Sequence, residues 1–366
     1  MRIVLITGDS SYSGAPMHVH RLALALKKKE LEILIIAPPG PLCSFVHADG
    51  ISCKSVKMRS FFDRRATHLI AEEVRKFAPQ IVHFHGTRGG WLGRLALRKM
   101  PQIKKVYTEH LWIKEYHLTN PAYDRLQRSG LKFLERYTDK IIAVSSAVKK
   151  HLLSQGFDSK KIVVIPHGIN SDFLHHKVLP KPEGVPLIIG SVGSLNKFKN
   201  HRNMILGFAH ARKMRPKANL HFEIIGDGQL LKELQGLARQ RNVEKYIRFN
   251  NLRSPEQIAE RLEHYAVFAN ISLSESFGLA VGEAMAVGLP VVVSRVGGLT
   301  DLVNNQCGIF VPPRQPVKIA EALVKLIDDR KLREKLGAAG RARIQKHFKE
   351  ETMVARTLVL YRELLK

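Results

Sequence analysis

Short apolar runs alternate with amphipathic stretches along most of the chain. The runs are typical of strands buried on both faces, and the stretches between them repeat apolar positions every three or four residues, as helices do. The strands predicted in the first half are 2–7, 31–37, 81–85, 105–109, 141–145 and 162–166. The helices predicted there are 16–29, 64–77, 90–99, 121–136 and 146–154. Alternation of this kind predicts a parallel sheet with helices on both faces.

Residues 179–186 interrupt this pattern, because three prolines and one glycine in eight residues exclude a helix or a central strand. The alternation then restarts. The predicted strands are 187–193, 221–226, 247–249, 267–271, 291–293 and 308–311, and the predicted helices are 200–213, 229–240, 255–264, 279–287, 299–303, 316–328 and 350–365.

Two passages of the same pattern predict an α/β chain of two Rossmann-like, doubly wound domains that face a central cleft. The expected boundaries are 1–178 for an N-terminal domain, 179–186 for a linker and 187–348 for a C-terminal domain. The remaining segment, 349–366, is expected to form a helix that is a candidate to pack back on the first domain.

Length and charge narrow the picture. A chain of 366 residues is long for one core and suits two domains. The formal net charge of +27 is spread over both halves and favours anionic partners such as lipid surfaces, phosphorylated substrates or nucleic acid. The alternative is a solvated basic surface without a specific partner.

Three scattered cysteines, Cys43, Cys53 and Cys307, form no Cys-x-x-Cys pair. We therefore expect neither a disulfide framework nor a zinc site, and infer a reducing, cytoplasmic location. No apolar run approaches the ~20 residues that span a bilayer. The basic charge also fits peripheral contact with the inner face of the cytoplasmic membrane.

One short helix has well-marked ends. Gly278 stands before an apolar helix predicted over 279–287, and Gly288 fits the position after its end. Pro290 prevents the helix from continuing, and a buried strand is predicted at 291–293.

The start of that helix is the strongest candidate site. A glycine there lets the backbone approach a ligand closely, and the free amides at a helix start suit a phosphate. Glu275 precedes the helix and Glu283 lies in its first turns. Carboxylates can accept hydrogen bonds from sugar hydroxyls, so the two could hold both ends of a sugar nucleotide. The alternative for Glu283 is that it complements the helix dipole.

Seven residues separate Glu275 from Glu283, and five further segments have a marked composition: Ile165-Pro166-His167-Gly168, Ser191-Val192-Gly193-Ser194-Leu195, Lys199-Asn200-His201, Ile224-Ile225-Gly226-Asp227-Gly228 and Gly297-Gly298-Leu299-Thr300-Asp301. In this order they resemble the family 4 retaining glycosyltransferases of the GT-B fold, in particular capsule, exopolysaccharide and lipopolysaccharide members. Glu275 and Glu283 form the E-x7-E element of that family. The resemblance extends along essentially the whole chain.

The resemblance implies roles for the donor site. Glu275 would act in catalysis by holding hydroxyls of the transferred sugar, and Glu283 would bind the ribose diol. The backbone amides of three further residues would hold sugar and diphosphate oxygens; they are Phe277, Gly278 and Leu279.

Three other positions in the second domain are assigned in the same way. Lys199 would bind the diphosphate, and Leu252 would lie where the backbone meets the base. Ser194 stands where the family often has an arginine, so the usual pair of cations at the diphosphate is in doubt.

In the first domain, Gly14 lies in the turn between the first strand and the first helix, a standard place for a phosphate in such domains. The resemblance puts Gly14 beside the donor diphosphate. His110 closes a predicted strand and matches the family's cleft histidine near the sugar, which makes it the second catalytic candidate. His85 matches less firmly.

The sequence shows no Asp-x-Asp after a strand and no grouped histidine or cysteine ligands. We therefore expect no metal and no cofactor other than the nucleoside-diphosphate sugar that serves as donor. Helix ends and cations would neutralise the pyrophosphate.

Two stretches with aromatic and cationic residues, 58–65 and 112–128, are candidates to recognise the acceptor or an anionic membrane. Core aromatics beside solvated charges are the equal alternative for each.

The resemblance implies an enzyme that moves a hexose-type sugar, with retention of configuration, to a hydroxyl of a cell-envelope glycan or lipid-linked acceptor. It implies that residues 1–178 bind the acceptor and residues 187–348 bind the nucleotide sugar. A sugar-nucleotide epimerase or hydrolase of the same fold is the alternative. A basic nucleic-acid-binding protein is a remote third, since no nucleic-acid motif is present and no nucleic-acid partner is expected.

Overall fold

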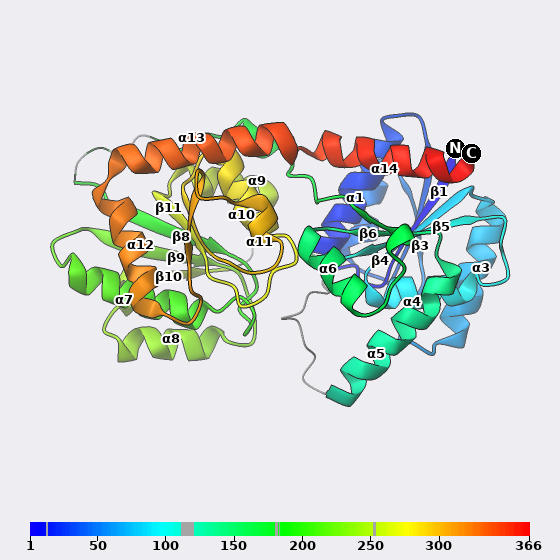
Figure 1. Cartoon of the computed structure of the whole chain (residues 1–366), viewed down its shortest axis with the longest axis horizontal. Helices are drawn as coiled ribbons and strands as arrows, with labels where there is room; N and C mark the ends of the chain where they lie inside the picture. The colour runs from blue at the N-terminus through cyan, green and yellow to red at the C-terminus, as the bar shows by residue number, and fades with distance from the viewer. Residues whose placement is uncertain (12–13, 111–120, 180–181, 183, 252–253) are drawn as a thin grey trace. The chain divides into compact units, whose positions relative to one another are not determined.

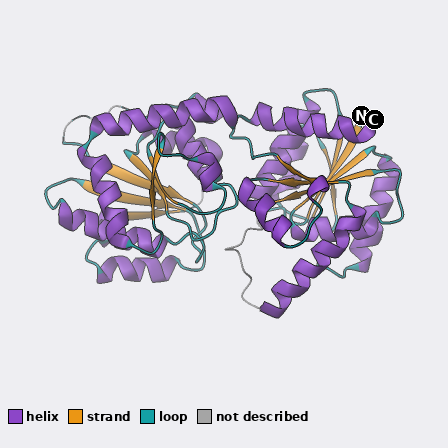
Figure 2. Ribbon diagram, in the orientation of Figure 1, coloured by secondary structure: helices purple, strands orange, loops and turns teal. Residues whose placement is uncertain are grey.

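A computed structural model of the chain describes all residues except 12–13, 111–120, 180–181, 183 and 252–253. The chain forms two compact units. The first unit comprises Met1–His167 and Glu351–Lys366, and the second unit comprises Gly168–Glu350. Each is a parallel sheet between layers of helices, as the alternating sequence pattern predicts (Figure 2).

The first unit contains a seven-stranded sheet in the order β3-β2-β1-β4-β5-β6-β7 (Figure 1). Every pair of neighbours in it is parallel. The strands are β1 Arg2–Thr7, β2 Glu32–Ala37, β3 Ser52–Ser55, β4 Ile81–His85, β5 Lys104–Glu109, β6 Lys140–Ala143 and β7 Ile162–Val164.

The helices of the first unit cover both faces of this sheet. They are α1 Gly14–Lys27, α2 Pro41–Ala48, α3 Arg64–Phe77, α4 Thr87–Ala96, α5 Pro121–Leu134 and α6 Ser146–Ser154, with short 3-10 turns η1 Glu135–Tyr137 and η2 Ser159–Lys161. Burial of the apolar strand residues between these helices supplies the main driving force for folding the unit.

The second unit contains a six-stranded parallel sheet in the order β10-β9-β8-β11-β12-β13. Its strands are β8 Leu187–Val192, β9 Leu220–Ile225, β10 Ile247–Asn250, β11 Val267–Asn270, β12 Val291–Ser294 and β13 Gly308–Val311. Its helices are α7 His201–Met214, α8 Leu231–Gln240, α9 Pro255–Glu263, α10 Leu279–Val287, α11 Leu299–Leu302, α12 Pro316–Asp328 and α13 Arg330–His347, with η3 Ser171–Leu174 and η4 Glu244–Tyr246.

The last helix, α14 Glu350–Leu365, packs against the core of the first unit. Met353 and Leu358 join the apolar cluster beneath it. The hydroxyl of Tyr361, fully buried, lies 2.6 Å from Nδ1 of His83 on β4. Helix and sheet are therefore held by both apolar burial and a buried hydrogen bond.

The boundary between the units differs from the expected linker at 179–186. Residues 168–178 were assigned to the first domain, whereas their contacts lie within the second unit. The backbone amide of Ile169 donates to the carbonyl of Phe348 at 2.7 Å. Arg341 on α13 donates to the carbonyls of His176 and Leu174. Hydrogen bonds to backbone carbonyls thus tie this segment to α13 and its C-terminal end.

The cysteines correct one expectation. Cys43 on α2 and Cys53 on β3 form a disulfide bond, with their Cα atoms 5.6 Å apart, while Cys307 is free and buried. The pair joins two neighbouring elements, and only their packing brings the sulfurs together. Within the described residues, no helix combines the length and the apolar character needed to cross a membrane.

Candidate functional site

The amino-terminal end of α10 is the main candidate site of the second unit. Gly278, the N-cap residue, has φ 102° and ψ 53°, a left-handed conformation that favours glycine. No side chain of the described residues caps this helix. The first amides of α10 therefore lack the usual side-chain acceptor and are suited to an external anion.

Neighbouring loops fix the approach to this helix. The backbone amide of Gly298 donates to the carbonyl of Glu275 at 2.9 Å. Phe277 is 1% exposed and packs against Phe348, with 5.9 Å between the ring centroids. The loop before α10 is thus anchored on both sides, so that its backbone presents a fixed shape to a ligand.

Lys199 and Glu275 meet beside the start of α10. The Nζ of Lys199 lies 2.6 Å from Oε2 of Glu275, and the Ser272 hydroxyl donates to the same carboxylate oxygen at 3.3 Å. The two side chains come from loops that follow adjacent strands, β8 and β11. The fold therefore places one cation and one carboxylate together at the edge where parallel sheets bind ligands.

The loop that carries Lys199 is shaped by two asparagines. The side-chain oxygen of Asn196 accepts from the backbone amide of Lys199 at 3.1 Å. Asn200 adopts a left-handed conformation, and its side-chain amide donates to the carbonyls of Ile271 and Pro313 at 2.9 and 2.7 Å. These bonds hold the loop against the β11 segment and so orient the lysine.

The other predicted donor residues occupy the same unit. Leu279 is the first residue of α10 and Glu283 lies in its second turn, half-buried. Ser194 is exposed in the loop after β8, next to Gly193, whose Cα faces the side chain of Lys199. Leu252 lies outside the described residues, so its predicted role stays a prediction.

In the first unit, Gly14 is the first residue of α1 and is exposed. His110 directly follows β5, and His85 is the last residue of the adjacent strand β4. Both histidines are buried, and Nδ1 of His85 lies 3.2 Å from Nε2 of His110. Two imidazole rings therefore lie in contact at the carboxyl edge of this sheet.

Further histidines, which the sequence analysis did not assign, extend the group. The Nδ1 of His110 lies 3.4 Å from Nε2 of His167, and Nδ1 of His167 lies 3.1 Å from Nδ1 of His18 on α1. The ring of His83 lies tilted against that of His85, with 4.0 Å between the ring centroids. We call His18, His83, His85, His110 and His167 the histidine cluster.

Burial keeps the histidine cluster uncharged. It lowers the pKa of His83 to about 3 and that of His167 to about 4. Burial, followed by the neighbouring imidazoles, holds the pKa values of His18, His85 and His110 well below the usual value. At neutral pH the rings are therefore neutral, and each has one donor and one acceptor nitrogen.

Three members of the histidine cluster come together only in the fold. One ring nitrogen each of His18, His85 and His110 lies within 4.8 Å of the other two. The grouping is invisible in the sequence because the three residues come from α1, from the end of β4 and from the residue after β5.

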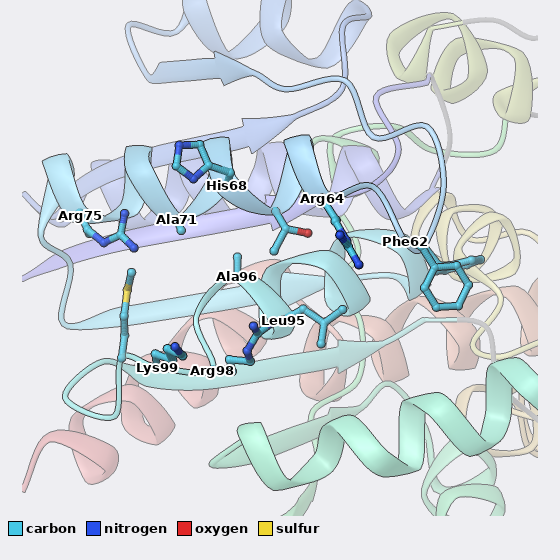
Figure 3. Close-up of a pocket in the computed structure, with 12 residues that line it drawn as sticks. Phe62, Arg64, His68, Ala71, Arg75, Leu95, Ala96, Arg98 and Lys99 are labelled. Atoms are coloured by element: carbon cyan, nitrogen blue, oxygen red, sulfur yellow. The ribbon is translucent and has the colours of Figure 1, made fainter.

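The predicted acceptor stretch 58–65 borders a pocket of about 700 Å³ in the first unit. Figure 3 shows the residues that line it: α3 contributes Arg64, His68 and Arg75, the segment after α4 contributes Arg98 and Lys99, and Phe62 lies at one end. Phe62 is 72% exposed. The second stretch, 112–128, begins outside the described residues and is not tested.

Two family models match the chain. The model for Glycosyltransferase Family 4 matches residues 12–173, and that for Glycosyl transferases group 1 matches residues 172–343. The chain belongs to the family 4 glycosyltransferases. In this family 4 glycosyltransferase the α10 site lies within the second match and the histidine cluster within the first.

A curated relative is D-inositol 3-phosphate glycosyltransferase of Corynebacterium diphtheriae, 27% identical over 278 residues, or 71% of this chain. The alignment covers 65% of that relative, so this chain spans just under two thirds of the relative's length.

Solved structures confirm the GT-B fold predicted from the sequence. A glycosyltransferase from Rickettsia africae matches with a TM-score of 0.83 and 22% identity, over 100% of this chain and 98% of that one. The Anabaena protein HepE in complex with UDP matches with a TM-score of 0.85 and 17% identity, over 99% and 100%. HepE also has a structure in complex with UDP-glucose.

Proposed function

We infer that this family 4 glycosyltransferase transfers a hexose-type sugar from a nucleoside-diphosphate donor to a hydroxyl group, with retention of configuration. The observation that carries the proposal is the side-chain-uncapped start of α10 with the Lys199–Glu275 pair beside it. Helix amides and one cation match a diphosphate, and a carboxylate matches sugar hydroxyls. UDP-sugars are the first donors to test, because HepE binds UDP and UDP-glucose.

Donor binding would rearrange the Lys199–Glu275 pair. The diphosphate would take the ammonium group of Lys199, and the carboxylate of Glu275 would then accept hydrogen bonds from hydroxyls of the transferred sugar. Glu283 would hold the ribose, and Ser194 would leave the diphosphate with fewer cations than an arginine there would give. Positioning and stabilisation of charge on the leaving diphosphate would supply the rate enhancement.

His110 is proposed as the second catalytic residue. Its imidazole is neutral at pH 7, because burial and the adjacent histidines keep its pKa well below the usual value. A neutral ring can exchange hydrogen bonds with a sugar hydroxyl without placing a positive charge in the site. We propose that a leaving-phosphate oxygen, not a protein carboxylate, receives the acceptor proton on the same face of the sugar.

The acceptor is proposed to be a hydroxyl of a cell-envelope glycan or of a lipid-linked, anionic molecule. The pocket lined by Arg64, Arg75, Arg98 and Lys99 supports this, since clustered cations attract phosphate groups. The exposed ring of Phe62 suits the interface of a membrane, and we propose that this contact is made at the cytoplasmic face. No metal is required by this proposal.

The test combines binding with turnover. Thermal-shift measurements with UDP, GDP and ADP identify the base, since a ligand at one hundred times its Kd adds about 2.7 kcal/mol of stability. Incubation with nucleotide sugars and an envelope lipid extract should then yield an α-linked product and free nucleoside diphosphate.

Two variants make the assay specific. Glu275→Gln keeps the side-chain shape but removes the charge, and it should lower transfer by about 10²–10³-fold. Glu321→Gln, at an exposed ion pair on α12, is the matched control. Undiminished transfer by Glu275→Gln contradicts the assigned site, and donor turnover without any acceptor favours a hydrolase or epimerase instead.

A further inference from the structure

The pocket of the first unit has the composition of an anion site (Figure 3). Three arginines and one lysine are among the described residues that line it, and none of those residues is acidic. Cations placed around a hollow reinforce one another's positive potential there, which attracts an anionic ligand. The volume of about 700 Å³ suits a small molecule.

The fold brings three of these cations toward one end of the pocket. Helices α3 and α4 pack against each other, and each leads back to the start of the next strand of the parallel sheet. Both helices therefore end at the amino edge of the sheet, opposite the carboxyl edge that holds the histidine cluster. Arg75 lies in the last turn of α3, and Arg98 and Lys99 follow the end of α4.

These three cations are free to bind an anion. Within the described part of the chain, none of their side chains takes part in a hydrogen bond or an ion pair. The acidic residues of α3 next to Arg75, Glu72 and Glu73, contact Lys76 instead, at 2.7 and 3.6 Å. An anion that enters the pocket therefore does not have to displace an acidic partner from the three cations.

The rest of the lining is largely apolar. Ala71 on α3 and Ala96 on α4 lie across the pocket from each other, and their small side chains leave the hollow open (Figure 3). Leu95 and Met100 add apolar surface. Phe62, 72% exposed, lies at the end near the start of α3. Apolar surface left exposed in this way suits contact with an alkyl chain.

We propose that this pocket binds the phosphate group of a lipid, with Arg75, Arg98 and Lys99 around the phosphate and the apolar lining along the chain. Arginine can bind phosphate through two parallel hydrogen bonds, and lysine binds it as a point charge. A lipid uses both the cations and the apolar surface, whereas free phosphate uses only the cations. The inference rests on the membrane contact proposed above and names the chemical group that is recognised there.

The test uses dihexanoyl phosphatidic acid, a short-chain lipid phosphate that dissolves without forming a membrane. Titration calorimetry on the full chain should give one site. Inorganic phosphate should bind about tenfold more weakly, because it buries no apolar surface. Dihexanoyl phosphatidylcholine should also bind about tenfold more weakly, because its choline group cancels the charge of the phosphate.

Two variants separate the halves of the site. Arg75→Gln should raise the Kd for the lipid phosphate about tenfold, because it removes a hydrogen bond to a charged group. Ala96→Leu keeps every charge but fills the hollow, so it should weaken binding of the lipid and leave that of inorganic phosphate unchanged. Both positions are at least partly exposed, and circular dichroism melts establish that each variant is folded.

Lys76→Gln is the matched control, because it removes the same charge from the next residue of α3, whose ammonium group is already paired with Glu72. The proposal is overturned if phosphatidic acid does not bind, if inorganic phosphate binds as tightly, or if Arg75→Gln binds the lipid as tightly as the control does. Glu275→Gln, which should lose transfer, should bind phosphatidic acid as the unaltered chain does. A failure of the lipid site is thereby distinguished from a failure of the proposed transferase site.

Discussion

The two units of this glycosyltransferase handle charge in opposite ways at the same edge of the same kind of sheet. In the second unit an ion pair, Lys199–Glu275, stands beside the uncapped start of α10. In the first unit the carboxyl edge holds buried imidazoles kept neutral by their surroundings. The second-unit edge suits a charged ligand, whereas the first-unit edge suits neutral hydrogen bonding.

The difference shows that the Rossmann-like architecture fixes where a ligand binds but not which chemistry it meets. In both units the residues that follow the parallel strands lie together at the carboxyl edge of the sheet. The residue types at that edge determine the chemistry. In the second unit the charges of Lys199 and Glu275 neutralise each other, whereas in the first unit burial keeps the histidines unprotonated and therefore neutral. Each solution has its own sensitivity to conditions.

Acidification should produce the largest contrast between the units. His83 and His167, with pKa values of about 3 and about 4, lie in the first unit, and His201, at about 3, lies in the second. These values are below the unfolded value of ~6.5, so the unfolded chain binds protons first as the pH falls. Stability is fully present above pH 6.5 and is lost below it, by about 2 kcal/mol per histidine at pH 5.

The described part of the first unit holds five histidines with lowered pKa values, whereas that of the second unit holds two, His201 and His221, so the first unit should open before the second. Hydrogen exchange at pH 7 and pH 5, corrected for intrinsic rates, reports on each unit separately. His167→Asn should reduce the loss of protection in the first unit. Equal loss in both units would show that the histidine cluster does not set the acid sensitivity.

The role of charge in the second unit is tested by removing the cation beside α10, Lys199. Lys199→Met should raise the Kd for the nucleoside diphosphate about 10- to 100-fold, since a hydrogen bond to a charged group contributes about 1.5–3 kcal/mol. It should leave the histidine cluster unchanged. Titration calorimetry with the diphosphate identified by the thermal-shift screen measures the effect.

Lys318→Met is the control, because it removes a lysine from an exposed ion pair with Glu321 in the same unit. Such surface pairs contribute little. If Lys199→Met binds the nucleoside diphosphate as tightly as this control does, the cation at α10 is not a ligand contact.

The sequence predicts the second-unit site far better than the first-unit cluster, for a physical reason. The bounds of α10, Leu279–Val287, were predicted correctly because glycines mark both ends, and Gly288 does adopt the left-handed C-cap conformation. The contact of Lys199 with Glu275 was not predictable, although both residues were assigned. The histidine cluster depends on how strands of the first unit pair, which no local pattern contains.

The elements that were missed have weak local signals. Helix α13, Arg330–His347, is largely polar, so it lacks a clear apolar repeat. It also contains two glycines, and glycine is unfavourable in the interior of an isolated helix. One of them, Gly337, is required by packing, since a Cβ there would lie 2.0 Å from the carbonyl oxygen of Gly288. Strand β3 has only four residues and an exposed pattern, so neither it nor the Cys43–Cys53 bond beside it was expected.

The smallest predicted effect is on membrane binding by the positively charged pocket of the first unit. Its cations line the pocket between α3 and the segment after α4 (Figure 3). If this pocket meets anionic lipid, Arg98→Gln should weaken partition onto anionic vesicles about fivefold, because one basic residue near such a surface contributes about 1 kcal/mol. Vesicle sedimentation at low salt measures the partition.

Arg248→Gln is the control, because it removes one exposed arginine from the second unit and changes the net charge by the same amount. A response shared by both variants would trace the binding to the overall charge of +27. A response confined to Arg98→Gln, and absent with zwitterionic vesicles, would instead locate it in the pocket. The first unit would then bind anions at the pocket beside α3, while the histidine cluster at the carboxyl edge of its sheet stays neutral.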